Sequence, residues 1–122
     1  MIDLPDVLAR KLRERGYDAK TRKLADISKG GIAVRRIPST TIARNYDGTR
    51  EIAYLTQVVV SREDEMVAID EIEAITELVP MLDLASDNGS YKLTSTEVYT
   101  DPNELQTGVW EVRFRSLITT KG

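Results

Sequence analysis

A chain of 122 residues is close to the commonest size of a single domain, so one compact core is expected over residues 1–122. Its composition, 41% hydrophobic and 30% charged residues, is typical of a globular protein. Histidine and cysteine are both absent, which excludes disulfides, thiolate nucleophiles and the Ser-His and Cys-His pairs of many hydrolases.

The charge is divided unevenly along the chain. Residues 1–50 hold 12 Lys and Arg against 6 Asp and Glu, whereas residues 51–122 hold 5 against 14. Three interpretations fit this asymmetry: a basic face for nucleic acid, a subunit whose positive side docks on the negative side of an identical neighbour, or ordinary solvated surface.

The sequence contains no signal for a membrane. Its first residues lack the basic start and apolar run of a signal peptide, and no segment approaches the roughly 20 apolar residues that span a bilayer. We therefore expect a protein made in the cytoplasm, with no membrane partner.

The first predicted element is a helix over Ile2–Arg15. Asp3 has the residue type of an N-cap, and Asp6 stands three positions later, as in an acidic variant of the capping box. Gly16 follows as the C-terminal stop. Residues 17–31 are expected to be irregular or weakly extended.

A hairpin is predicted next. Ile32–Ile37 is typical of a strand that Pro38 ends or places at an edge, and Thr40–Tyr46 is a second extended run. The Asp47-Gly48 pair is a strong turn signal, and Arg50–Ser61 is the returning strand, apolar on both faces toward its end.

The clearest predicted helix covers Arg62–Val79, with Ser61 and Asp64 as a capping box. Apolar residues recur at helical spacing on one face. The opposite face is acidic throughout, with these residues: Glu63, Asp64, Glu65, Asp70, Glu71, Glu73 and Glu77.

Two further strands are predicted, Tyr91–Thr100 and Val109–Thr120, with Asp101-Pro102-Asn103 as the turn. The last strand alternates plainly, with Trp110, Val112, Phe114 and Ile118 on one side. The order of elements predicts an α+β fold, in which two helices pack on one face of an antiparallel or mixed β-sheet.

Carboxylates are the only dense source of chemistry in the sequence. Asp70, Glu73 and Glu77 have the spacing that brings side chains together on a helix, and such groups can bind Mg²⁺ or Ca²⁺ or perform acid-base catalysis. A solvated or partner-binding acidic face is the more common occurrence, so we predict no catalytic residue, no metal site and no cofactor.

Nucleic-acid binding is the second alternative. Its candidate residues are not interleaved with stacking aromatics, and no helix-turn-helix or zinc-finger pattern accompanies them, so sequence-specific recognition of nucleic acid is not expected. The candidates are Lys20, Arg22, Lys23, Lys29, Arg35 and Arg36.

One stretch resembles a known family. Gly31–Ser39, which reads GIAVRRIPS, is followed by Arg44–Arg50, which reads RNYDGTR. This combination of a strand end, a Tyr-Asp-Gly turn and a long strand resembles the phage minor capsid protein group, which is similar to the tail-terminator proteins of long-tailed phages. The acidic helix and the closing strands follow in the same order as in that family. Asn45 departs from the pattern, because an aromatic residue often stands there.

The resemblance implies a single tail-terminator-like domain, without catalytic residues, that assembles as a homo-oligomeric ring, usually hexameric. Such a ring sits at the head-tail junction of the virion, stops polymerisation of the tail-tube protein and faces the head connector. The interface residues that we expect in the hairpin and before it are Arg35, Arg36, Arg44, Tyr46, Asp47, Gly48 and Arg50. Another head-tail connector, a tail-tube protein and a small DNA-binding accessory protein are the alternatives.

Overall fold

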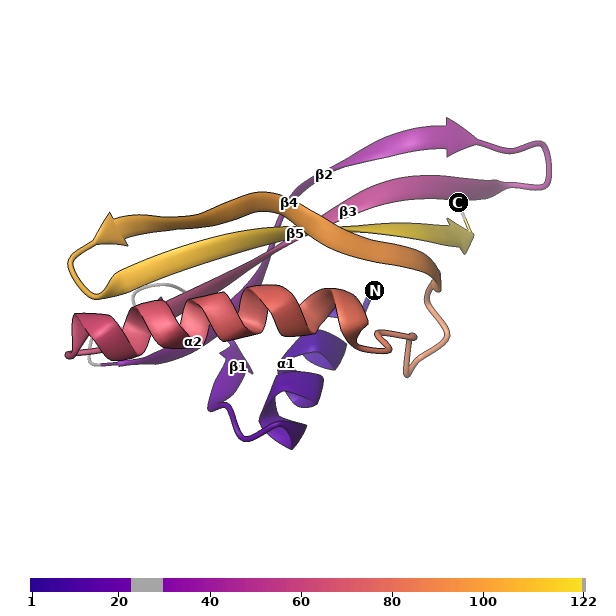
Figure 1. Ribbon diagram of the computed structural model, residues 1–122. Coiled ribbons are helices and arrows are strands. Elements are labelled where there is room, and N and C mark those ends of the chain that lie inside the picture. The colour runs from indigo at the N-terminus through magenta and orange to yellow at the C-terminus, as the bar shows by residue number, and fades with distance from the viewer. Residues whose placement is uncertain (23–29, 122) are drawn as a thin grey trace.

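The computed structural model describes residues 1–22 and 30–121. Within them the chain forms two α-helices and one five-stranded mixed sheet, the predicted α+β fold (Figure 1). The elements are α1 (Leu4–Glu14), β1 (Ala19–Thr21), β2 (Gly31–Arg44), β3 (Thr49–Ser61), α2 (Glu65–Leu78), a 3₁₀ turn (Val79–Met81), β4 (Lys92–Gln106) and β5 (Val109–Lys121).

The sheet has the strand order β1-β2-β3-β5-β4. Only β1 runs parallel to its neighbour, and the other pairs are antiparallel. The central pair is β3 with β5, which stay in register without a shift from Thr49 opposite Lys121 to Ser61 opposite Val109. The two outer long strands, β2 and β4, both contain register shifts.

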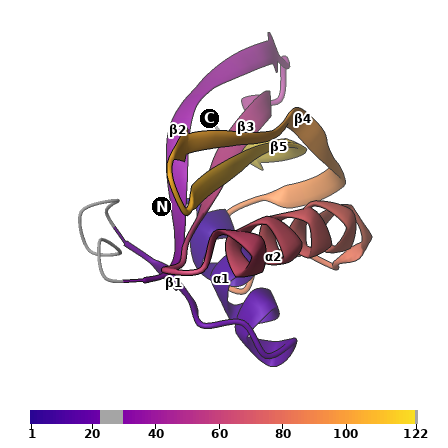
Figure 2. The same ribbon diagram turned by 60° about the vertical axis from the view of Figure 1, so that its left-hand side comes forward.

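Both helices cover the same face of the sheet, as predicted (Figure 2). Val58 and Phe114 point to that face and form one buried cluster with Leu8 of α1 and Ile72 of α2. On the opposite face the described residues form only a small separate cluster around Val59. Because strand side chains alternate between faces, this division follows the period-two pattern of β3 and β5.

A second, smaller cluster lies toward the other end of the same sheet face. Leu4 at the start of α1 packs there with Tyr54, Tyr91 and Ile118. The Tyr91 hydroxyl is buried and donates a hydrogen bond to the backbone carbonyl of Leu84. Burial of this hydroxyl raises the pKa of Tyr91 above its usual value.

The two predicted capping boxes differ from the structure. Asp3 is the N-cap of α1, but its side chain does not cap the helix, and the Asp6 carboxylate accepts a hydrogen bond from the Thr21 hydroxyl at 3.0 Å. Ser61 is the last residue of β3, so α2 begins later than predicted and is capped by Asp64, which accepts from the Met66 amide at 2.9 Å.

Several strand limits also differ from the prediction. The segment before residue 23 includes the short strand β1 rather than only irregular chain, and residues 23–29 of the segment lie outside the described residues. Pro38 does not end its strand, because β2 continues to Arg44, but it lies at an edge, the other predicted possibility, since β1 pairs only with Ile32–Val34. Pro102 does not lie in a turn, because β4 continues to Gln106. Both prolines stand at register shifts. Among the described residues, neither helix has the length and apolar character needed to cross a bilayer.

Candidate assembly surfaces

The β2–β3 hairpin extends away from the helices as an arm, here defined as residues 38–50 (Figure 1). Its turn is the predicted one. The Asn45 amide donates to the Thr49 carbonyl at 2.9 Å, and the Asp47 carboxylate accepts from the Thr49 amide at 3.0 Å. Gly48 has φ +86°, a backbone conformation that strongly favours glycine. These contacts fix the shape of the arm's tip.

The arm presents apolar and cationic side chains to solvent. Tyr46 is fully exposed at the tip, and Ile42 is 57% exposed. Arg44 is exposed between them. β1 pairs only with Ile32–Val34, so among the described residues no strand lies beside the free edge of β2 beyond that point. Such an exposed edge is a surface that can pair with another chain.

The predicted interface residues fall into two groups. Arg44, Tyr46, Asp47, Gly48 and Arg50 lie together at the end of the arm. The other two, Arg35 and Arg36, lie near the base of β2, about 30 Å away at the usual rise of a strand. Consecutive strand residues point to opposite faces, so these two side chains do not form one patch.

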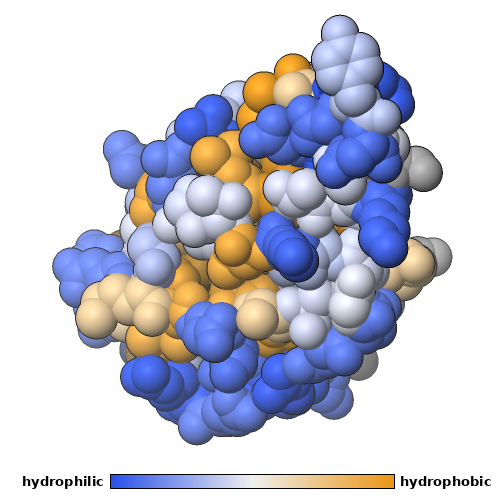
Figure 3. Space-filling view, turned by 90° about the vertical axis from the view of Figure 1, so that its right-hand side faces the viewer, coloured by the Kyte–Doolittle hydropathy of each residue, from blue (hydrophilic) through white to orange (hydrophobic). Residues whose placement is uncertain are grey.

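A cleft of about 730 Å³ lies between the start of the chain, the tip of the arm and the ends of β4 and β5. We call it the basic cleft, because Arg50, Lys92 and Lys121 line it, together with Asp47 and Tyr91. Figure 3 views this end of the molecule and shows apolar surface in a hollow surrounded by hydrophilic side chains. The sequence prediction included Arg50 and missed both lysines, because nothing in the linear order indicates that Lys92 and Lys121 meet the arm.

The cations that line the basic cleft are available to pair with anions of another molecule. Among the described residues, none of Arg50, Lys92 and Lys121 forms an ion pair. The Nε atom of Arg50 is buried without a hydrogen-bond partner in that part of the chain. The Asp47 carboxylate is held by the Thr49 hydroxyl and amide, and these hydrogen bonds lower the pKa of Asp47.

The opposite end of the molecule is acidic. The start of α2 packs beside the end of β4, where Glu104 lies near Glu65. Interaction with the Glu65 carboxyl, by hydrogen bonding and like-charge repulsion, raises the pKa of Glu104 together with desolvation. Met66 and Leu105, the next residues along the chain, are 63% and 45% exposed. We call these four residues the acidic end.

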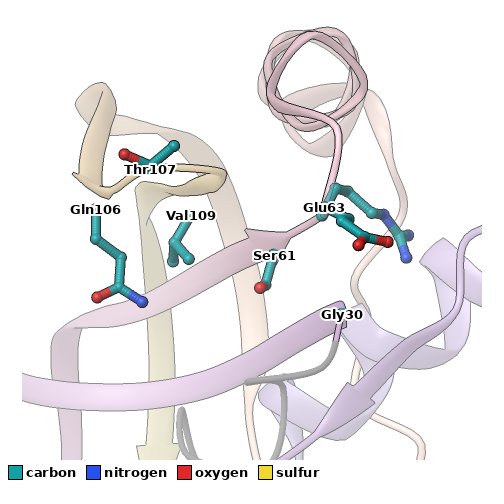
Figure 4. Close-up of a pocket in the computed structure, with 7 residues that line it drawn as sticks. Gly30, Ser61, Glu63, Gln106, Thr107 and Val109 are labelled. Carbon is teal, nitrogen blue, oxygen red and sulfur yellow. The ribbon is translucent and has the colours of Figure 1, made fainter.

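A second cleft, of about 450 Å³, lies near the acidic end (Figure 4). Its lining is mostly polar and includes Ser61, Arg62, Glu63 and Gln106. Its one cation is already engaged, because Arg62 pairs with Asp18 at 2.7 Å and with Glu71 at 2.5 Å. These two ion pairs connect the end of β3 with α2 and with the segment before β1. Arg62 therefore holds these parts of the fold together.

The predicted acidic face of α2 is present. Glu71 is engaged with Arg62, while Asp70, Glu73 and Glu77 are exposed. No group of three potential metal ligands occurs among the described residues.

The basic residues considered for nucleic acid do not form a continuous stripe in the described part of the chain. The guanidinium group of Arg22 donates to the backbone carbonyl of Ile32 at 2.9 and 3.1 Å. Arg35 and Arg36 point to opposite faces of β2. Lys23 and Lys29 lie outside the described residues.

Comparison with known proteins finds solved structures with a similar fold but assigns the chain to no family. No protein-family model matches the chain, and no curated protein matches it. Among the solved structures that match is a chain from the virion of a native gene transfer agent particle, with a TM-score of 0.48 and 15% sequence identity. The match covers 95% of this chain and 85% of that chain. Similarity at this level carries no conclusion about function.

Proposed function

We propose that this protein is a structural virion assembly protein of a phage or prophage, and that it acts as a tail terminator. Identical copies form a closed ring, a hexamer as the family resemblance implies. The ring sits on the head-proximal end of the tail tube, stops the polymerisation of the tube protein and offers its other side to the head connector.

The observation that carries this proposal is the arm. Residues 38–50 hold an exposed tyrosine, an exposed isoleucine and an exposed arginine away from the helices, although burial of apolar groups is the main driving force of folding. An arm of this kind gains stability when a second molecule covers it. In a ring each subunit uses two different surfaces, one for each neighbour, and a projecting arm can supply one of them.

The polar chemistry of the described residues fits a structural role better than catalysis. Glu111 is the most buried carboxylate, and it contacts Gln57, Asn103 at 3.3 Å and Arg113 at 3.3 Å on the sheet face away from the helices. These contacts join three strands, although Gln57 Oε1 and Arg113 Nε have no hydrogen-bond partner among the described residues. The proposal therefore assigns no reaction and no cofactor.

The test removes the tip of the arm. Replacing residues 43–50 by a two-residue Asn-Gly turn connects Ile42 to Glu51 with a common hairpin geometry. We expect this variant to remain folded by circular dichroism and to stay monomeric by light scattering. The unaltered protein is expected to form rings of one size in negative-stain images.

Tyr99→Ala is the matched control, because Tyr99 is another exposed tyrosine, at 55%, on β4 outside the arm. It should leave ring formation unchanged. Rings formed equally well by the shortened variant would contradict the role of the arm. Open tubes that grow without limit, in place of rings, would support the alternative of a tail-tube protein.

A further inference from the structure

We propose that the acidic end of one copy docks in the basic cleft of the next copy. This inference rests on the proposed ring and specifies which two surfaces of the subunit meet. The donor surface consists of Glu65, Met66, Glu104 and Leu105. The receiving surface is the cleft lined by Arg50, Lys92 and Lys121.

The receiving surface carries more cations than anions. Its three cations form no ion pair among the described residues, and its one acid, Asp47, is held by Thr49. Carboxylates from outside the subunit would pair with these cations through charge-assisted hydrogen bonds.

The charge and the apolar side chains of the donor surface complement those of the basic cleft. Packing of α2 beside β4 brings two carboxyl groups near each other there, an arrangement that is unfavourable when both are ionised and that nearby cations relieve. In addition, the exposed side chains of Met66 and Leu105 are the kind of flexible apolar groups that fill a hollow. The cleft is lined by the apolar side chains of Met1 and Ile2 as well as by the three cations, so it matches both features.

The two surfaces lie at opposite ends of the molecule. The start of α2 and the β4–β5 turn are at one end, and the arm with the start of β3 and the end of β5 is at the other (Figure 1). They cannot meet within one subunit. A contact between different surfaces of identical copies is heterologous, and it generates a closed ring when the rotation closes.

The experiment exchanges the charges of the two surfaces. One variant carries Glu65→Lys and Glu104→Lys, so both of its ends are positive. A second variant carries Lys92→Glu and Lys121→Glu, so both are negative. Each alone should assemble at least about tenfold more weakly than the unaltered protein, because like charges then meet at every contact.

Mixing the two variants should restore rings, because alternating copies present opposite charges at each contact, which an even-numbered ring allows. A chain that carries all four substitutions should also assemble alone. Glu73→Lys with Glu77→Lys is the matched control, since both residues are exposed on α2 outside the acidic end. We expect this control to form rings normally. Circular dichroism checks that every variant is folded.

The outcomes separate this inference from the proposed function. If the unaltered protein forms rings and neither reversed variant is weakened, the docking contact is wrong and the ring proposal stands. If only the cleft variant is weakened, the cleft receives another occupant, and the docking contact is again wrong. If the unaltered protein stays monomeric at every concentration, the ring itself is contradicted.

Discussion

Gly108 shows how a single residue sets the geometry of the β4–β5 turn. It has φ +76°, and its carbonyl accepts a hydrogen bond from the Arg62 amide at 2.9 Å. A Cβ atom at this position would lie 2.4 Å from the Arg62 carbonyl oxygen. The turn therefore packs against the end of β3 so closely that only glycine fits without movement of backbone.

We predict that Gly108→Ala lowers the free energy of unfolding by about 2–4 kcal/mol, since it combines an unfavourable φ with steric overlap. Gly89→Ala is the control, because Gly89 has a similar φ of +74° but open space around a Cβ atom. Its loss should be only about 1–2 kcal/mol. Urea unfolding measures both. Equal losses would show that the overlap with Arg62 relaxes at no cost.

At the scale of elements, Asp3 joins α1 to the turn over residues 86–90. Its carboxylate accepts from the Ser86 hydroxyl at 2.7 Å and from the amides of Asp87 and Asn88 at 3.0 and 3.1 Å. Desolvation alone would raise the pKa of Asp3, but these hydrogen bonds together with one from Ser90 outweigh it, and the pKa is lowered from 3.8.

A lowered native pKa means that the ionised form stabilises the fold. This stabilisation is complete above the ordinary pKa and is lost as the pH falls through the lowered value. The stability difference between the unaltered protein and Asp3→Asn should therefore be largest at neutral pH and shrink below about pH 4. Urea midpoints measured from pH 7 to pH 3 test this. Asp70→Asn, which removes an exposed carboxylate, is the control, and a difference for Asp3→Asn that does not change with pH would contradict the assignment.

The limits of β2 and β4 were not predictable from their prolines alone. Proline removes a backbone donor, so the sequence predicts that Pro38 ends its strand or lies at an edge, and that Asp101-Pro102-Asn103 is a turn. Both lie in outer strands of the sheet and at register shifts, where a missing donor breaks no regular ladder. Whether a proline ends a strand depends on the presence of a partner on that side, which the local sequence does not specify.

At the scale of the whole molecule, the structure separates charge between two ends. The basic cleft lies at one end and the acidic end at the other, and each includes or adjoins exposed apolar side chains. Attraction between exposed charges weakens when salt shortens the Debye length from about 10 Å at 0.1 M to about 3 Å at 1 M.

We therefore predict that assembly weakens as salt rises between about 0.1 M and 1 M. The mean mass measured by light scattering at a fixed protein concentration should fall with added sodium chloride. The variant with all four charge substitutions is the control and should show the same trend. Rings that become more stable with salt would indicate an interface dominated by apolar contacts instead.

The sequence by itself determined the type and order of the two helices and the long strands, and the division of charge along the chain. Alternation in β5 and helical spacing in α2 identified the core residues Phe114 and Ile72, and Asp47-Gly48 identified the arm's turn, because these signals depend only on near neighbours. Only the tertiary structure placed Lys92 and Lys121 beside Arg50 and brought Glu65 against Glu104. Those residues are distant in the chain, and the order and register of the strands decide which of them meet.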